Sequence, residues 1–360
     1  MRRVFVSDCE GPISKNDNAF ELTMHFVPLG DKLFTVISRY DDVLADVVRK
    51  PGYEAGDTLK LVLPFLKAYN VKDEHMEDFS RRSLALISNA QDTLRHVRSL
   101  APAFIVSTSY EHYVRALCQY VGFPFENTRC TRVSIDKYQM TKEEKKELQM
   151  LANEISQMPV YDIPPAASSL KDLPIEVRTI VDRLDEIFWR QIASMDIGRI
   201  FSEVSTVGGT GKVKAIEEIV GDQGATLEKV MYVGDSITDC GALGLVKCGG
   251  GLTISFNGNE YAVENAEVAI LSENSLVTAV VADVFLRFGK PDTMALVEGW
   301  SRNALEKSSV DRTLLDRLFG MYPGKLPKVK IITDQNMESL SGESRRFRKK
   351  VRGEEIGRLG

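Results

Sequence analysis

The sequence predicts an α/β fold: a Rossmann-like parallel sheet with helices on both faces, a helical cap inserted after the first strand, and a second helical insertion. Short apolar runs rich in β-branched and aromatic residues alternate with segments of helical periodicity, which is typical of strand–helix–strand units. Two intervals between the runs are too long for single crossovers. The five strand-like runs are RRVFVS, PAFIVS, KVMYV, GLTISF and EVAIL.

The bulk composition indicates a folded, soluble chain. Its 360 residues include 43% hydrophobic residues and carry a net charge of -5, which is unlike a general nucleic-acid binder. No apolar run approaches the roughly 18 residues of a membrane span, so we expect no membrane association and a cytoplasmic location. The five cysteines are odd in number and form no C-x-x-C pair, which argues against a disulfide framework or a zinc site.

The first two strands are separated by about eighty residues with amphipathic stretches, which is more than a single crossover needs. We therefore predict a catalytic core that begins with residues 1–12 and resumes over 96–137, with a helical cap over 13–95 between them. Residues 138–204 contain two helical stretches joined by a Pro-rich connector. This insertion carries no recognised motif and is predicted to serve as a lid, a dimerisation element or a docking site for a protein partner.

The third piece of the core is predicted over 205–290, and residues 291–360 form a helical C-terminal extension. The extension becomes increasingly charged and ends with the basic cluster SRRFRKKVR, residues 344–352. We interpret this cluster as a solvated terminus rather than a docking element, and the last twenty residues as compatible with disorder.

Two carboxylates lie one residue apart at the end of the first strand, in the stretch VFVSDCEG. Asp8 and Glu10 point to the same side of an extended segment, and Gly11 allows the backbone to turn away sharply. A strand that only fills a core needs neither carboxylate. Taken alone, the pair is equally compatible with a solvated turn.

Further polar side chains follow the ends of other predicted strands, where ligands bind in open α/β sheets. Ser107 belongs to FIVSTS, Lys212 opens a helix after GGTG, and Asp235 and Asp239 belong to MYVGDSITD. Together with the first acidic pair, these groups match metal-assisted phosphoryl transfer. A carboxylate attacks phosphorus, a hard divalent cation neutralises charge, and a lysine and a hydroxyl hold the remaining oxygens.

The order and spacing of these stretches resemble the four motifs of the haloacid dehalogenase superfamily of phosphotransferases. Within it, the chain is similar to the phosphoserine phosphatase-like branch, including its phosphoserine:homoserine phosphotransferase type. The Asp-x-Glu-Gly form, the stretches STSYEHYVRALCQYVGFP and RCTRVSID, and a cap between the first two motifs carry this resemblance. It implies that Asp8 is the nucleophile that forms an aspartyl-phosphate and that Ser107 and Lys212 bind phosphate.

The resemblance also implies that Glu10 protonates the leaving oxygen and then activates water. It implies Mg²⁺ held by the Asp8 side chain, the Glu10 backbone carbonyl and Asp235, with Asp239 supporting that shell. Most phosphatases of the superfamily carry Asp at the position of Glu10, so the longer side chain puts the geometry of proton transfer in question. Asp239 also fits a carboxylate that interacts with a helix N-terminus, and both roles can coexist.

Several alternatives compete with individual assignments. Lys214 competes with Lys212 for the phosphate, although the preceding glycines favour Lys212. The block GDSITD also occurs in esterases with Ser236 as the nucleophile, but all four histidines precede it, which is the wrong order for that triad. GGTGKV imitates a P-loop, yet Val213 stands where Ser or Thr is required.

The predicted function is a Mg²⁺-dependent phosphatase for a small phosphorylated metabolite, acting through an aspartyl-phosphate. The alternatives are a phosphotransferase to an alcohol acceptor and a non-catalytic interaction subunit of the same fold. A homo-oligomer or a protein partner is compatible with the 138–204 insertion. Substrate specificity is implied to come from the cap, but spacing does not assign its candidate contacts, which are Arg39, Tyr40, Arg81 and Arg82.

Overall fold

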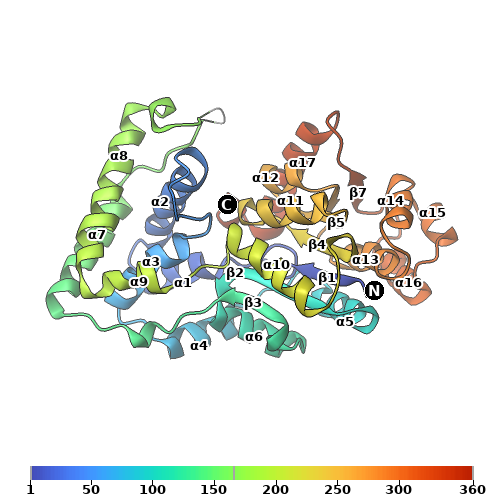
Figure 1. Cartoon of the computed structure of the whole chain (residues 1–360), viewed down its shortest axis with the longest axis horizontal. Helices are drawn as coiled ribbons and strands as arrows, with labels where there is room; N and C mark the ends of the chain where they lie inside the picture. The colour runs from blue at the N-terminus through green and yellow to red at the C-terminus, as the bar shows by residue number, and fades with distance from the viewer. Residues whose placement is uncertain (1, 165–166, 359–360) are drawn as a thin grey trace.

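The computed structural model describes residues 2–164 and 167–358, and it contains one seven-stranded sheet in the order β3-β2-β1-β4-β5-β6-β7 (Figure 1). Strands β1 to β6 are parallel, and β7 pairs antiparallel with β6. The predicted α/β class with a mostly parallel sheet is therefore confirmed. The strands are β1 Val4–Ser7, β2 Ala103–Tyr110, β3 Thr128–Thr131, β4 Val230–Gly234, β5 Leu252–Phe256, β6 Val268–Leu271 and β7 Lys328–Ile331.

All five apolar runs of the sequence form strands, whereas β3 and β7 were not predicted. The sequences of these two strands, TRCT and KVKI, are short and partly polar, so the β pattern is weak. Strand β7 lies at the edge of the sheet, where exposed lysines such as Lys330 discourage pairing with another chain. It also shows that the C-terminal extension is not wholly helical.

Strand β1 lies at the topological switch point of the sheet. The chain passes from β1 outward to β2 and β3, and later returns to place β4 on the other side of β1. Ser7 is in register with Ile105 of β2 and with Val233 of β4. The carboxyl ends of these three strands therefore lie side by side, which is where ligands bind in such sheets.

Helices cover both faces of the sheet because alternate strand residues point to opposite sides. Phe5 belongs to the apolar cluster shared with α5 (Ala90–Leu100), α6 (Glu111–Val121) and α13 (Leu276–Phe288). Val4 and Val6 belong to the opposite cluster. That second cluster is completed by α10 (Thr210–Asp222), α11 (Cys240–Cys248) and α12 (Glu260–Asn265).

The cap and the second insertion share a single apolar core, although we predicted them from the sequence as separate units. Leu63 of the cap and Leu148, Ile155 and Phe188 of the insertion are fully buried in the same cluster. Figure 1 shows the insertion helices beside the cap helices on one side of the molecule. The cap contains α1 (Asn18–Phe26), α2 (Gly30–Asp42), a π-helical turn (Val43–Val47), α3 (Thr58–Ala68) and α4 (Asp73–Ser83); the insertion contains α7 (Lys142–Gln157), α8 (Ile175–Glu186) and α9 (Ile200–Glu203).

The cap boundary also differs from the predicted 13–95. Helix α5 begins at Ala90, and its residues Leu94 and Val97 pack in the core cluster. The core therefore resumes before residue 96, because the apolar face of α5 covers the sheet rather than the cap.

The C-terminal extension adds α14 (Lys290–Glu298), α15 (Arg302–Lys307), α16 (Arg312–Met321), β7 and α17 (Met337–Arg352). The interpretation of residues 344–352 as a solvated terminus is wrong, since this basic cluster lies within α17 and Arg348 is only 3% exposed. Two of its cations, Arg348 and Arg352, pair with the buried carboxylate of Asp235. A charge count along the sequence does not reveal this contact. No helix in the described part of the chain is long and apolar enough to cross a membrane.

Candidate active site

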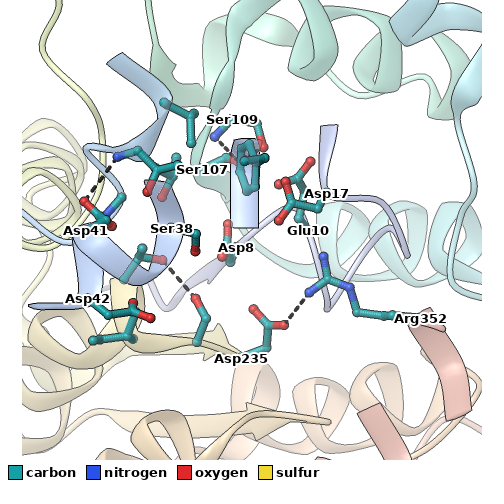
Figure 2. Close-up of a pocket in the computed structure, with 18 of the residues that line it drawn as sticks. Asp8, Glu10, Asp17, Ser38, Asp41, Asp42, Ser107, Ser109, Asp235 and Arg352 are labelled. Atoms are coloured by element: carbon teal, nitrogen blue, oxygen red, sulfur yellow. Dashed lines mark hydrogen bonds and ion pairs between the residues drawn. The ribbon is translucent and has the colours of Figure 1, made fainter. Parts of the chain in front are cut away.

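The predicted site residues meet at the carboxyl ends of β1, β2 and β4, where the cap closes over the sheet (Figure 2). Of these residues, Asp8, Glu10, Ser107 and Asp235 line a cavity of about 100 Å³, whereas the buried Lys212 contacts Asp8 without lining it. Asp8 directly follows β1 and Asp235 directly follows β4. The lining of the cavity includes Asp8, Glu10, Asp17, Ser38, Asp41, Asp42, Ser107, Ser109, Asp235, Arg348 and Arg352.

Lys212 is fully buried between two carboxylates. Its Nζ lies 2.7 Å from Asp8 Oδ2 and 2.8 Å from Asp239 Oδ1. Burial would lower the pKa of Lys212, but the charges of Asp239 and Asp8 more than offset it and hold that pKa above its ordinary value. A permanent cation therefore lies against the carboxylate that is predicted to be the nucleophile.

Lys214, the competing lysine, is exposed on the outer side of α10. The helix begins at Thr210, so Lys212 lies in its first turn, next to the ends of the strands. Helical geometry turns residue 214 by about 200° from residue 212, which puts the two side chains on different faces. The structure thus brings Lys212, and not Lys214, to Asp8.

Asp239 is saturated by hydrogen bonds. Besides Lys212, its carboxylate accepts from the Tyr232 hydroxyl at 2.6 Å and from the backbone N–H groups of Asp235 at 2.9 Å and Ser236 at 3.1 Å. Burial alone would raise the pKa of Asp239, but Lys212 and these donors lower it below the ordinary value. Asp239 therefore supports Lys212 and the loop after β4.

Asp8 is buried in the same network. Burial raises the pKa of Asp8 to about 7, Lys212 opposes the shift, and the charges of Asp239 and Asp235 add to it. Asp8 Oδ2 meets Lys212, and Asp8 Oδ1 accepts a hydrogen bond from the Cys9 backbone at 2.6 Å. Additional positive charge beside Asp8 would favour the ionised form that a nucleophile requires.

Glu10 lies beside Asp8 on the same side of the cavity (Figure 2). Its Oε1 accepts a hydrogen bond from the Asn18 backbone at 2.7 Å. Burial, and secondarily the charge of Asp17, raises the pKa of Glu10 well above its ordinary value. The raised pKa favours the protonated form, which is the form that a general acid needs.

Gly11 makes the close approach of the first loop to Asp235 feasible. Its φ is +101°, and a Cβ at this position would lie 2.1 Å from Asp235 Oδ2. Both the backbone conformation and the contact exclude a side chain. Gly11, which was predicted to allow a sharp turn, thus also leaves the space that the Asp235 carboxylate occupies.

Ser107 lies where the regular pairing of β2 with β3 ends, since the register shifts between Ser107 and Tyr110. Its hydroxyl donates to Ser109 Oγ at 3.1 Å and accepts from the Ser109 backbone at 3.2 Å. Figure 2 places both serines at the edge of the cavity. Only Ser107 was predicted from the sequence as a site residue. The repeated hydroxyl residues of the stretch STS could also have indicated Ser109.

The cap contributes residues different from the candidates named from the sequence. Tyr40 is buried inside the cap, where its hydroxyl binds Asp185. Arg81 and Arg82 are exposed beside Asp78. The candidate Arg39 pairs with Asp42 at 3.1 Å. None of these four lines the cavity, because their places on α2 and α4 turn them away from it.

The cap side chains that do face the cavity include Asp41 and Asp42 of α2 (Figure 2). Asp41 accepts hydrogen bonds from the Tyr53 hydroxyl at 2.7 Å and the Gly56 backbone at 2.9 Å, while burial raises its pKa to about 7. Burial also raises the pKa of Asp42 to about 6, against the effect of Arg39. Neither carboxylate was predicted from the sequence, because two adjacent acidic residues on a helix are also compatible with a solvated face.

Arg348 and Arg352 of the C-terminal helix are the least expected members of the site. Both guanidiniums pair with Asp235 Oδ2, Arg352 at 3.1 Å. Their spacing of four residues puts them on one face of α17. Helical periodicity in the basic cluster could have indicated a common direction, but not the partner.

The carboxylates fit a hard divalent cation. Ligand atoms of Asp8, Asp235 and Asp239 lie within 4.8 Å of one another, and all three residues are buried. Because Asp239 is saturated, Asp8 and Asp235 are the side chains best able to bind a cation. Oxygen donors of this kind suit Mg²⁺, so the donor set agrees with the cofactor that the sequence implies.

Comparison with known proteins gives a similar fold without an assigned activity. No family model matches the chain, and neither does any curated protein. The gene product AF1437 from Archaeoglobus fulgidus matches with a TM-score of 0.80 and 26% identity over 100% of this chain and 99% of that chain. Its stated description names no function.

Phosphoserine phosphatase structures are more distant. An apo form matches with a TM-score of 0.43 and 14% identity over 81% of this chain and 100% of that chain. A substrate-bound complex matches with a TM-score of 0.43 and 12% identity over 76% and 95%. These likenesses are too weak to assign an activity to this chain.

Proposed function

We propose that this chain is a Mg²⁺-dependent phosphatase that hydrolyses a small phosphate monoester through an aspartyl-phosphate on Asp8. The observation that carries the proposal is the placement of the Asp8 carboxylate at the switch point of the sheet, 2.7 Å from the Lys212 ammonium and beside Glu10 and Asp235. This arrangement places a nucleophile, a proton donor and a metal ligand in one cavity, with the fixed cation Lys212 against the nucleophile.

The chemistry begins with attack by an Asp8 carboxylate oxygen on phosphorus. The new bond joins that oxygen to phosphorus, and the bond between phosphorus and the alcohol oxygen breaks. Lys212 stabilises the ionised carboxylate and the charge on the transferred group. Ser107 and Ser109 supply hydroxyls at the same edge of the cavity.

Glu10 moves the protons in both half-reactions. Its raised pKa keeps a proton available for the departing alcohol oxygen. The resulting Glu10 carboxylate then takes a proton from the water that attacks the phosphoaspartate. The hydrogen bond from the Asn18 backbone fixes the side chain in both forms, so the longer Glu is compatible with the role.

A divalent cation fits the acidic lining of the cavity. Six carboxyl groups line it against two arginines, Arg348 and Arg352, and both of these already pair with Asp235, so a cation would ease the approach of a phosphate dianion. When bound to Asp8, Asp235 and the Glu10 carbonyl, Mg²⁺ would neutralise phosphate charge. The carboxylates of the lining are Asp8, Glu10, Asp17, Asp41, Asp42 and Asp235.

The substrate is proposed to be small and phosphorylated. The cavity of about 100 Å³ is well below the roughly 300–1,000 Å³ of sites for drug-sized ligands. Hydrogen bonds from Thr210 to Glu54 and from Tyr261 to Asp46 hold the cap against the core. A larger leaving group would require these contacts to open.

The test is hydrolysis of an aryl phosphate and of a panel of phosphorylated metabolites, with and without Mg²⁺. We expect activity that requires Mg²⁺ and is lost in Asp8→Asn, while the exposed control Asp78→Asn keeps it. Equal rates for the wild type and Asp8→Asn would refute the proposal. Phosphate transferred to an added alcohol would indicate a phosphotransferase, and complete inactivity with all substrates would favour an interaction subunit.

A further inference from the structure

The C-terminal helix α17 lies directly against the active site. Leu340 anchors it in a small apolar cluster with Val263 and Leu271, and the buried Ser344 donates to the Gly258 carbonyl at 2.6 Å. Arg348 continues the same face one turn later. The helix therefore directs a buried arginine toward the loop that follows β4, instead of leaving its basic residues in solvent.

Arg348 holds Asp235 by two oxygens. Its Nη1 donates to the backbone carbonyl at 3.2 Å and also to Oδ2 of the same residue. The Arg348 side chain is 3% exposed. A buried guanidinium is costly unless it is paired, so this contact fixes both the backbone and the carboxylate of the predicted metal ligand.

Arg352 joins two loops of the site. Its Nη1 donates to Asp235 Oδ2 at 3.1 Å, its Nε donates to the Lys15 carbonyl at 3.0 Å, and its Nη2 donates to the Asn16 carbonyl. Residues 15 and 16 belong to the segment that links Glu10 to α1. Figure 2 shows Arg352 reaching from α17 to Asp235. One planar side chain thus spans the loops after β1 and β4.

The contacts leave one oxygen of Asp235 available. In the described part of the chain, both guanidiniums contact Oδ2 of this carboxylate and neither contacts Oδ1. A carboxylate can bind a cation with one oxygen and accept hydrogen bonds with the other. Two arginines on Oδ2 therefore fit a carboxylate that is oriented for a metal, rather than one that is blocked.

We propose that Arg348 and Arg352 are positioning residues of the active site, which hold Asp235 for the cation and tie it to the 15–16 segment, so that the site is assembled only when α17 is docked. This inference rests on the proposed function for the identity of the ligand. We call the contacts of Arg348 and Arg352 with Asp235 and residues 15–16 the strut. The strut is a property of the metal-free chain. The two parts can therefore be tested separately.

The first measurement is hydrogen–deuterium exchange of the full-length, metal-free chain. Arg352→Ala removes the link between the loops, so peptides covering residues 11–17 and 235–239 should exchange faster. Arg346→Ala is the matched control, because Arg346 is exposed on the same helix. Unchanged exchange in both peptides would overturn the strut.

The second measurement is isothermal titration of Mg²⁺ alone into the same proteins. Loss of an outer partner of a metal ligand typically costs about 10–100-fold in affinity, and we expect this loss for Arg348→Ala and Arg352→Ala but not for Arg346→Ala. Wild-type affinity in the two variants, or tighter binding, would overturn the positioning role; tighter binding would mean that the arginines compete with the cation.

Arg352→Lys keeps the proposal testable if the alanine variants fail to fold. Lysine keeps the charge but cannot make the three directed contacts of the guanidinium, so we expect an intermediate Mg²⁺ affinity and faster exchange of residues 11–17. Wild-type behaviour of Arg352→Lys would reduce the role of Arg352 to charge alone. If the wild type itself binds no Mg²⁺ and hydrolyses no phosphate ester, the proposed function fails, while the exchange experiment still decides the strut.

Discussion

Replacing Glu10 by Gln separates proton transfer from phosphoryl transfer. Gln keeps the Oε1 oxygen that accepts from the Asn18 backbone at 2.7 Å, so the side chain should stay in place. It removes the acid and the base together. General acid–base help is typically worth about 10²–10⁴-fold, or roughly 3–5 kcal/mol of activation free energy, and we expect a loss of this size.

The loss should depend on the leaving group. An alkyl phosphate needs a proton on its departing oxygen, whereas an aryl phosphate does not. The Glu10→Gln variant should therefore release the aryl alcohol in a fast burst and then stall, because hydrolysis of the phosphoaspartate still needs the base.

Stopped-flow absorbance would measure the burst, with the exposed cap variant Glu77→Gln as the control. The wild type should lose alkyl phosphatase activity at high pH, as Glu10 gives up its proton above its raised pKa. An equal slowing of all substrates without a burst would refute the role of Glu10.

Two further predictions concern packing and charge. Gly11→Ala should lower the phosphatase activity on the order of 100-fold, because a Cβ would lie 2.1 Å from Asp235 Oδ2. The control Gly52→Ala also has a positive φ, but its Cβ would meet nothing within 4 Å, so this variant should keep its activity. Equal losses of activity in the two variants would contradict this prediction. Burial alone would raise the pKa of Asp283, but the hydrogen bond with His96 and two further donors lower it. The stabilisation that the ionised Asp283 carboxylate contributes to the fold is therefore present at neutral pH, and it is lost as the pH falls through that lowered pKa. Asp283→Asn should cost about 1–3 kcal/mol at pH 7, and its melting temperature should approach that of the wild type only once the pH falls below that lowered pKa; a difference independent of pH would contradict the charge argument.

The sequence was most informative where local pattern and chemistry coincide. The run before Asp8 is apolar and β-branched, and its carboxylates stand at the strand end, so both the strand and the position of Asp8 followed from short stretches. The same holds for Asp235 after β4. Lys212 was separated from Lys214 only by the glycines before it, and the structure places Lys212, buried, beside Asp8.

The sequence was least informative where a contact depends on distant segments. Arg348 meets Asp235 across 113 positions of the chain, and no local pattern specifies that pairing. Asp41 faces the cavity because α2 packs under the insertion, which itself depends on Leu148 and Phe188 of a segment without motifs. The basic tail looked solvated because composition counts charges and does not show where they point.

The most direct test of the account is a search for phosphate on Asp8. The wild-type chain would be mixed with Mg²⁺ and an aryl phosphate, quenched rapidly in acid, digested and analysed by mass spectrometry. The account predicts a phosphate adduct on the peptide that contains residues 4–13, located on Asp8 and absent from Asp8→Asn. An adduct on another residue such as Ser107 or Ser236, or steady turnover in which no adduct ever forms, would contradict it.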